Sequence, residues 1–156
     1  MAGRITNTRK TLIDIVVVVS AMAGETDELL KMACRLSKNP ARREIDLLLS
    51  SGERISAALL TIALQARGIP ALSMTGRQIG LQTDSTHTRA RIKNIDTQRA
   101  RTLLRENHVI VVAGFQRIIP EGHVTTLGRG GAEPSAVGLA VARRARPCVT
   151  LTGVHA

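Results

Sequence analysis

The residues best suited to chemistry lie in one glycine-rich segment, Thr125-Thr126-Leu127-Gly128-Arg129-Gly130-Gly131. It is followed by Pro134–Arg146, whose Ala- and Val-rich composition predicts a helix. Backbone N–H groups at a helix N-terminus, together with the positive end of the helix dipole, can receive phosphate or carboxylate oxygens. We therefore interpret the segment as an anion site, with a simple turn as the alternative for a glycine-rich loop taken alone.

The pattern of apolar residues predicts the strands that must position this loop. Ile13–Val19 is a β-branched run, typical of a strand buried on both faces of a parallel sheet, and we place it at the centre of the sheet. His108–Ala113 repeats the same pattern. Shorter strands are predicted over Ala71–Met74, Ala90–Ile95 and Cys148–Leu151.

Between these strands, apolar residues recur at helical spacing. Helices are predicted over Glu25–Leu36, Arg42–Arg67, Thr97–Glu106 and Pro134–Arg146. In the longest of them the apolar positions are Ile55, Leu59, Ile62, Ala63 and Ala66, and Ser51-Gly52 is a candidate break that would divide it in two. Alternating strands and helices predict an α/β fold: a three-layer αβα sandwich with a mainly parallel sheet.

The predicted sheet brings three polar loops together. In such sheets, ligands bind outside the carboxyl ends of the strands. We therefore expect Ser20–Thr26, Gly114-Phe115 and the glycine-rich segment to meet there and form a small-molecule site. The chain has neither the GxxxxGK[ST] pattern of a P-loop nor a GxGxxG after a strand, so a different phosphate-binding arrangement is required.

Composition argues for one globular domain without nucleic acid as a partner. The chain has 156 residues, of which 44% are hydrophobic, and a formal net charge of +10. Its arginines are scattered, and Phe115 is the one aromatic residue, so a stacking surface for single-stranded nucleic acid is not expected.

Cysteine spacing and hydropathy make further exclusions. Cys34 and Cys148 form no CxxC pair, so neither a metal site nor a disulfide is predicted, and both are expected to be buried free thiols. Ile13–Val19 is too short to span a bilayer, and Met1–Thr11 lacks the apolar core of a secretory signal. We therefore expect a cytoplasmic protein that does not bind membranes.

Several linked motifs together resemble the aspartate kinase branch of the amino acid kinase family. The resemblance extends from about Gly3 to the end of the chain. The motifs that carry it are Val16-Val17-Val18-Val19-Ser20-Ala21-Met22, Ser50-Ser51-Gly52-Glu53-Arg54, Thr83-Asp84 with His87-Thr88, Val112-Ala113-Gly114-Phe115-Gln116 and the glycine-rich segment Thr125–Gly131.

The resemblance implies transfer of the γ-phosphoryl group of Mg-ATP to the side-chain carboxylate of aspartate, in lysine, threonine and methionine biosynthesis. It also implies roles for individual residues, with Arg129 and Glu53 as the catalytic pair. Arg129 would hold an aspartate carboxylate in a bidentate fork, and Glu53 would accept the α-ammonium group. Ser20 and Thr26 would contribute hydroxyl groups, and Phe115 would shape the pocket.

The same resemblance assigns the phosphate side of the site. Gly128, Gly130 and Gly131 would approach the nucleotide phosphates, and Thr152 would belong to the nucleotide-binding half, with no protein ligand to a metal assigned. Taken alone, Glu53 could be a surface charge paired with Arg54, and Ser20 a hydroxyl that merely ends a strand. The shared pattern favours the binding roles.

The chain also departs from the family pattern. The family begins with a strand bearing Lys-Phe-Gly-Gly-Thr, which this chain lacks, and the family has Ser-Asp where Ala132 and Glu133 stand here. Gly153 occupies the position of a family aspartate, three residues before the last residue, Ala156. We therefore expect residues 1–156 to form a partial amino acid kinase domain without the first strand, most of the nucleotide-binding half or a regulatory ACT domain.

These departures leave two functions open. One is an aspartate kinase, active alone or with a chain that supplies the missing parts. The other is a non-catalytic aspartate-binding or assembly module. A sheet that lacks a strand leaves backbone groups unpaired, so we expect a homo-oligomer or association with a complementing chain.

Overall fold

The computed structural model describes the greater part of the chain. The described residues are 1–10, 14–83, 92–95, 98–114, 116–118, 124–126, 136–137 and 140. Most of the helix predicted over Pro134–Arg146, and all of the strand predicted over Cys148–Leu151, therefore lie outside the described residues.

Three of the described helices agree closely with predicted ones. They are α2 (Glu25–Leu36), α3 (Arg42–Gln65) and α4 (Gln98–Arg105), whereas α1 (Ala2–Arg9) was not predicted. The candidate break at Ser51-Gly52 does not divide α3. Glycine in a helix interior costs about 1 kcal/mol relative to alanine, but α3 approaches the chain at Ala21 so closely here that a Cβ on Gly52 would lie 2.9 Å from the Ala21 Cβ.

Three parallel strands form the sheet that carries the site. They are β1 (Val16–Val19), β2 (Ala71–Met74) and β5 (Val109–Ala113), in the order β1-β5-β2. In this register Val19 lies beside Ala113, and Met74 beside Val112, so the three strands end at the same edge.

The expectation that the first strand is the centre of the sheet is wrong. Within the described residues β5 is central, and all five of its residues are buried. In β1, Val16, Val17 and Val18 are only partly buried. Both strands are apolar β-branched runs, so periodicity alone could not distinguish the central strand from its neighbour.

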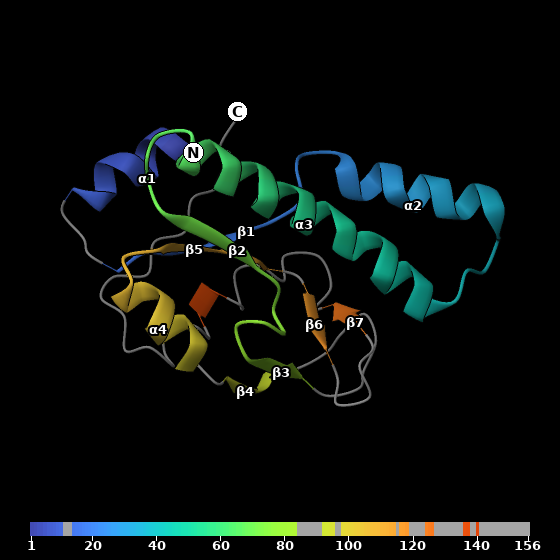
Figure 1. Ribbon diagram of the computed structural model, residues 1–156. Coiled ribbons are helices and arrows are strands. Elements are labelled where there is room, and N and C mark those ends of the chain that lie inside the picture. The colour runs from blue at the N-terminus through green and yellow to red at the C-terminus, as the bar shows by residue number, and fades with distance from the viewer. Residues whose placement is uncertain are drawn as a thin grey trace.

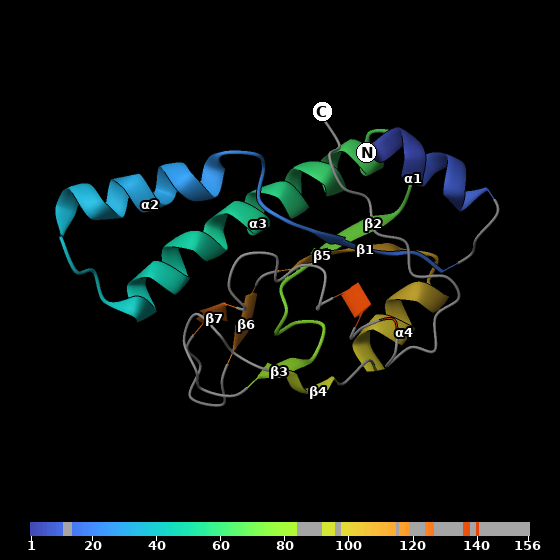
Figure 2. The same cartoon turned by 180° about the vertical axis from the view of Figure 1, so that it is seen from behind.

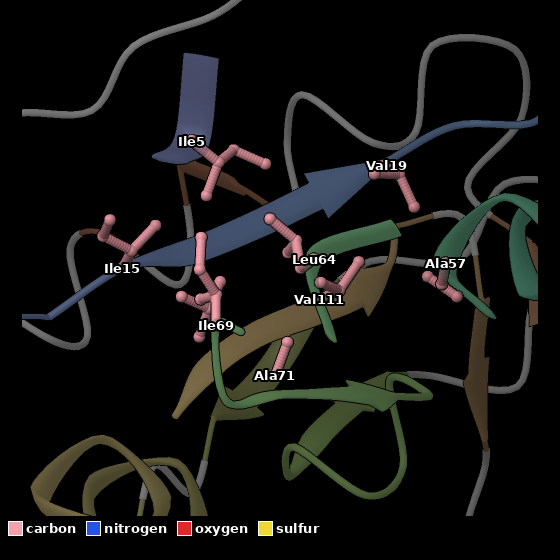
Figure 3. Packing of buried hydrophobic residues seen from close by; sticks show 10 residues of the cluster. Ile5, Ile15, Val19, Ala57, Leu64, Ile69, Ala71 and Val111 are labelled. Carbon is pink, nitrogen blue, oxygen red and sulfur yellow. The ribbon is translucent and has the colours of Figure 1, made fainter. Parts of the chain in front are cut away.

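Helices cover both faces of this sheet, as expected for a three-layer fold (Figures 1 and 2). On one face Ile5 of α1 and Leu64 of α3 pack against Val109 and Val111 (Figure 3). On the other face α4 packs its buried residues Ala100 and Leu104 against Ile110 and Val112. Because alternate residues of β5 enter the two cores, this strand holds the layers together.

A second, mixed sheet was not predicted from the sequence. Its strands are β3 (Leu81–Thr83), β4 (Ile92–Ile95), β6 (Gln116–Ile118) and β7 (Val124–Thr126), in the order β4-β3-β6-β7. The pairs β3/β4 and β6/β7 are antiparallel, and β3/β6 is parallel. The prediction of a mainly parallel sheet therefore holds for the first sheet alone. The first two residues of the glycine-rich segment, Thr125 and Thr126, belong to β7, which packs against α3.

The prediction that Cys34 is buried is wrong, because this side chain is exposed. It lies on α2, which packs along α3 and has no buried residue in its length (Figure 1). A helix that covers another helix, rather than the sheet, leaves most of its surface in solvent. Cys148 lies outside the described residues.

Candidate functional site

The carboxyl ends of β1 and β5 begin the site. The two ends lie side by side, and the Gly114 amide donates a hydrogen bond of 2.9 Å to the Val19 carbonyl oxygen. The Ser20–Gly24 loop therefore starts beside Gly114, in line with the predicted meeting of two of the three polar loops, while Phe115 lies outside the described residues. The third, after β7, lies outside the described residues.

Glu53 is the charged group that α3 brings to this edge. Its side chain is 5% exposed, so it is not a surface charge paired with Arg54. Its Oε1 accepts a hydrogen bond of 3.4 Å from the Ala21 amide in the loop after β1. Its Oε2 is buried and has no hydrogen-bond partner. One carboxylate oxygen is thus held by the loop, and the other is buried and unpaired.

Burial raises the pKa of the Glu53 carboxyl above its ordinary value. Hydrogen bonds from the backbone amides of Glu53 and Ala21 oppose this rise in pKa, and the negative charge of Glu25 adds to it. A buried carboxylate with an unpaired oxygen is unfavourable. A cationic group bound at Oε2 would stabilise the ionised form.

The face of α3 that meets the sheet is unusually polar. Asp46, Ser50, Glu53 and Thr61 are all buried on it. The hydroxyl groups of Ser50 and Thr61 form hydrogen bonds within the helix. Ser50 donates to the Leu47 carbonyl oxygen at 2.6 Å, and Thr61 donates to the Ala57 carbonyl oxygen at 2.8 Å. Glu53 has no such local partner for its second oxygen, which distinguishes it from these structural polar residues.

Ser20 and Thr26, the other described residues with predicted binding roles, lie on either side of the same loop. Ser20 directly follows β1 and is exposed, and Thr26 is half-buried in the first turn of α2. Ser20 is thus the first residue of the Ser20–Gly24 loop, Thr26 follows its end, and Glu53 accepts a hydrogen bond from Ala21 within it. The remaining predicted site residues, Phe115, Gly128, Arg129, Gly130, Gly131 and Thr152, lie outside the described residues.

Two residues without a predicted binding role, Glu25 and Gly52, also shape this loop. Glu25 accepts a hydrogen bond of 3.3 Å from the Met22 amide through its Oε2. Gly52 packs its bare backbone against Ala21, where a Cβ would be too close. The position of Gly52 beside Glu53, inside a long helical pattern, was the available signal, because an interior glycine often marks a close approach of two segments.

A separate cavity of about 470 Å³ lies between α3 and the carboxyl end of β2. Its polar lining includes Arg54, Ser73, Thr75 and Gln78. The Gln78 side chain is already engaged, since its Oε1 accepts a hydrogen bond of 2.8 Å from the Thr75 amide. None of the described residues with predicted binding roles lines this cavity, so it is distinct from the loop around Glu53.

No cluster of three or more His, Cys, Asp or Glu side chains suited to a metal ion occurs in the part of the chain that the structure describes. The α3 helix is long and apolar enough to cross a membrane by length and composition alone. Its packing against β1, β2 and β5 also fits a core helix.

Comparison with known proteins identifies the family. The model of the amino acid kinase family matches residues 1–156. The chain belongs to the amino acid kinase family. Among its members, the aspartate kinase of Stutzerimonas stutzeri is 50% identical over 141 residues, which cover 90% of this chain and 34% of that protein. The aspartokinase of Geobacillus stearothermophilus is also 50% identical, over 90% of this chain and 35% of its own length.

Solved structures agree with this membership of the amino acid kinase family. The aspartate kinase of Synechocystis has a TM-score of 0.77 at 48% identity, covering 92% of this chain and 23% of that chain. Aspartokinase III of E. coli, in complex with aspartate and ADP, has a TM-score of 0.71 at 23% identity, covering 84% of this chain and 40% of that chain. At that identity the second likeness supports the fold alone. This family member spans about a third of the curated relatives it matches.

Proposed function

We propose that this chain forms the aspartate-binding part of an aspartate kinase. The observation that carries the proposal is the buried Glu53 carboxylate, whose Oε2 lacks a partner at the carboxyl edge of the parallel sheet. An α-ammonium group donates three hydrogen bonds and carries a positive charge, so it would satisfy both the orphaned oxygen and the buried charge. The two aspartate kinases that are 50% identical to this chain support aspartate as the amino acid.

In the proposed site each residue has one task. Glu53 binds the α-ammonium group, and Ser20 and Thr26 offer hydroxyl groups from the loop after β1. Arg129 binds a carboxylate of aspartate, and Phe115 shapes the pocket. These groups orient the side-chain carboxylate for attack, and positioning of this kind is a large part of catalysis in phosphoryl transfer.

Mg-ATP is the proposed phosphoryl donor, and when bound it would supply the γ-phosphoryl group. Gly128, Gly130, Gly131 and Thr152 are the residues proposed for its phosphates. Since these residues lie outside the described part of the chain, the proposal for ATP rests on the motifs and on the ADP named in the E. coli complex. A cytoplasmic location and a role in lysine biosynthesis are proposed on the same basis.

A second function, a non-catalytic aspartate-binding or assembly module, is favoured by two sequence features. Ala132 and Glu133 replace the Ser-Asp of the family pattern, and Gly153 replaces an aspartate. Loss of a serine cap at a helix start typically costs about 0.5 to 2 kcal/mol. Both functions require aspartate binding, and they differ in phosphoryl transfer.

Calorimetry with the purified chain tests the binding step. Aspartate should bind, and succinate, which has the same carboxylates but no ammonium group, should bind at least about tenfold more weakly because a charged hydrogen bond is lost. Glu53→Gln and Arg129→Ala should each abolish most of the affinity for aspartate. Equal binding of aspartate and succinate would contradict the role of Glu53.

An assay with Mg-ATP and aspartate separates the two functions. Acyl phosphate formed on the aspartate side chain can be trapped as a hydroxamate. Turnover supports the kinase, and binding without turnover supports the non-catalytic module. Neither binding nor turnover would reject both.

A further inference from the structure

Two successive amides of the loop after β1 are held by carboxylates from two different helices. Glu53 of α3 accepts from the Ala21 amide at 3.4 Å, and Glu25 of α2 accepts from the Met22 amide at 3.3 Å. The second carboxylate oxygen of Glu53 is unpaired and is used in the proposed function, whereas Glu25 has no role there. The contacts of Glu25 show what this residue does for the loop.

Glu25 lies against the same point of α3 that carries Glu53. A Cβ built on Gly52 would meet the Ala21 Cβ at 2.9 Å, the Glu25 Cδ at 3.5 Å and the Glu25 Oε2 at 3.6 Å. The missing side chain of Gly52 therefore admits both the loop and the Glu25 carboxylate. Gly24, with φ of 81°, turns the chain into α2 directly before Glu25. Glu25 is the first residue of that helix, where the helix dipole favours a negative charge.

We propose that Glu25 is a positioning residue of the aspartate site. Together with Glu53 it clamps the Ser20–Gly24 loop through consecutive amides, which fixes Ser20 and directs the free oxygen of Glu53 toward the ammonium group. This inference rests on the proposed function for its ligand, but the clamp itself is a property of the loop.

Glu25 also acts on Glu53 through its charge. The strands β1, β2 and β5, which α3 covers, consist of residues without titratable side chains. The helix α1, whose sequence includes Arg4 and Arg9, lies beside the C-terminal end of α3, whereas Glu53 is in the middle of α3 (Figure 1). On α3 itself, Asp46 is buried two turns before Glu53, and Arg54 is exposed. Of the described groups on neighbouring elements, Glu25 is the one that raises the pKa of Glu53.

Amide hydrogen exchange tests the clamp without any ligand. Glu25→Ala removes the acceptor, so the Met22 amide should exchange about fivefold faster, as expected for one lost hydrogen bond. Glu25→Gln keeps a carbonyl acceptor and should restore slow exchange. The matched control is Glu28→Gln, which lies on the same helix, is exposed and pairs with Lys31. If Glu25→Ala and Glu28→Gln leave Met22 exchange equally unchanged, the clamp is rejected.

The pH dependence of aspartate binding tests the coupling to Glu53. Only the ionised carboxylate attracts the ammonium group, so affinity falls as pH drops through the pKa of Glu53. Glu25→Gln removes the neighbouring negative charge and lowers the pKa of Glu53. In this variant the fall of aspartate affinity at acid pH (the acid limb of the pH profile) should therefore occur at lower pH. At neutral pH its affinity should stay within about twofold of the unmodified chain, while Glu25→Ala should bind about fivefold more weakly.

The two experiments separate the inference from the proposed function. If the unmodified chain binds no aspartate, the proposed function fails, and the Met22 exchange rates alone decide on the clamp. If aspartate binds but the acid limb of Glu25→Gln coincides with that of the unmodified chain, the proposed function stands and the coupling of Glu25 to Glu53 is overturned.

Discussion

Burial of the Glu53 carboxyl lowers the stability of the fold at neutral pH. Its carboxyl is buried and its pKa is raised, so the folded chain holds this proton more tightly than the unfolded chain does. Stability from this group is therefore complete below the unfolded pKa and is lost as pH rises through the folded pKa. The proposed aspartate site requires the ionised form, so the pH at which it would bind best is also the pH at which Glu53 destabilises the fold most.

Glu53→Gln should reveal this cost. Glutamine does not ionise, so the variant escapes the loss of stability at high pH. The free energy of unfolding of the variant minus that of the unmodified chain should therefore be larger at pH 8 than at pH 4. Urea unfolding at both pH values measures it. The control is Glu44→Gln, which makes the same change at an exposed glutamate on the same helix. A difference for Glu53→Gln that does not depend on pH would contradict the raised pKa.

Part of the arrangement around the loop after β1 was predictable from the sequence. The family resemblance assigned Ser20, Thr26 and Glu53 to one site, and in the described structure they lie in or beside one loop, while their binding roles stay a prediction. Glu25 was not predicted, because an acidic residue in a first helical turn is expected for the dipole alone. Gly52 was interpreted as a possible break, because a sequence does not show which segment packs against a glycine.

At the scale of elements, α3 shows why the presence of a helix is easier to predict than the face that it buries. The apolar positions Ile55, Leu59 and Ile62 correctly indicate a helix, yet all three are exposed. The face turned to the sheet carries Asp46 and Glu53. A helix that builds part of a binding site buries polar groups, so its apolar stripe no longer marks the core.

Gly52→Ala should destabilise the chain although alanine favours helices. The new Cβ would lie 2.9 Å from the Ala21 Cβ, and overpacking of this kind costs about 1 to 3 kcal/mol. Thermal or urea unfolding measures the loss. Gly3→Ala is the matched control, because α1 has open space at Gly3, and it should gain up to about 1 kcal/mol.

Adding Ala21→Gly to the Gly52→Ala variant tests the same contact. This second change removes the atom that the new Cβ would strike, so part of the lost stability should return. The close approach of α3 to the loop would be refuted if Gly52→Ala proved as stable as the unmodified chain.

A second pair of variants tests the orientation of α3. Leu64 is fully buried and Leu59 is 50% exposed. Leu64→Ala should lower the free energy of unfolding by about 2 to 5 kcal/mol, and Leu59→Ala should change it by about 0.5 kcal/mol or less. Urea unfolding of both variants gives the comparison. Equal losses at the two positions would mean that α3 is rotated relative to the sheet.

At the scale of the whole molecule, the layered α/β order was predictable and the sheet pairing was only partly so. Alternating strands and helices indicated helices on both faces of the parallel sheet, and the structure has them. In the mixed second sheet the strand β4 was predicted within Ala90–Ile95, but β3, β6 and β7 were missed, because three-residue strands give too little periodicity to separate from loops. Non-local pairings of short strands depend on the fold around them.

Self-association is the prediction that belongs to the whole molecule. In the described part of the chain β1 and β2 pair with β5 alone, and edge strands offer unpaired backbone groups to a partner. The exposed apolar residues of α3 form a second surface suited to association between copies. We therefore predict a homodimer or larger assembly, so light scattering after size exclusion should give a mass well above the 16.7 kDa of one chain.

Two lysine substitutions test which surface is used. Ile62, 60% exposed on α3, would lie in an apolar contact between copies, whereas Leu36 is 90% exposed at the end of α2. Burying a lysine without a partner is costly, so Ile62→Lys should shift the protein toward monomer and Leu36→Lys should not. If Ile62→Lys assembles normally, the sheet edge must provide the contact. A stable monomer of the unmodified chain throughout the micromolar range would contradict self-association.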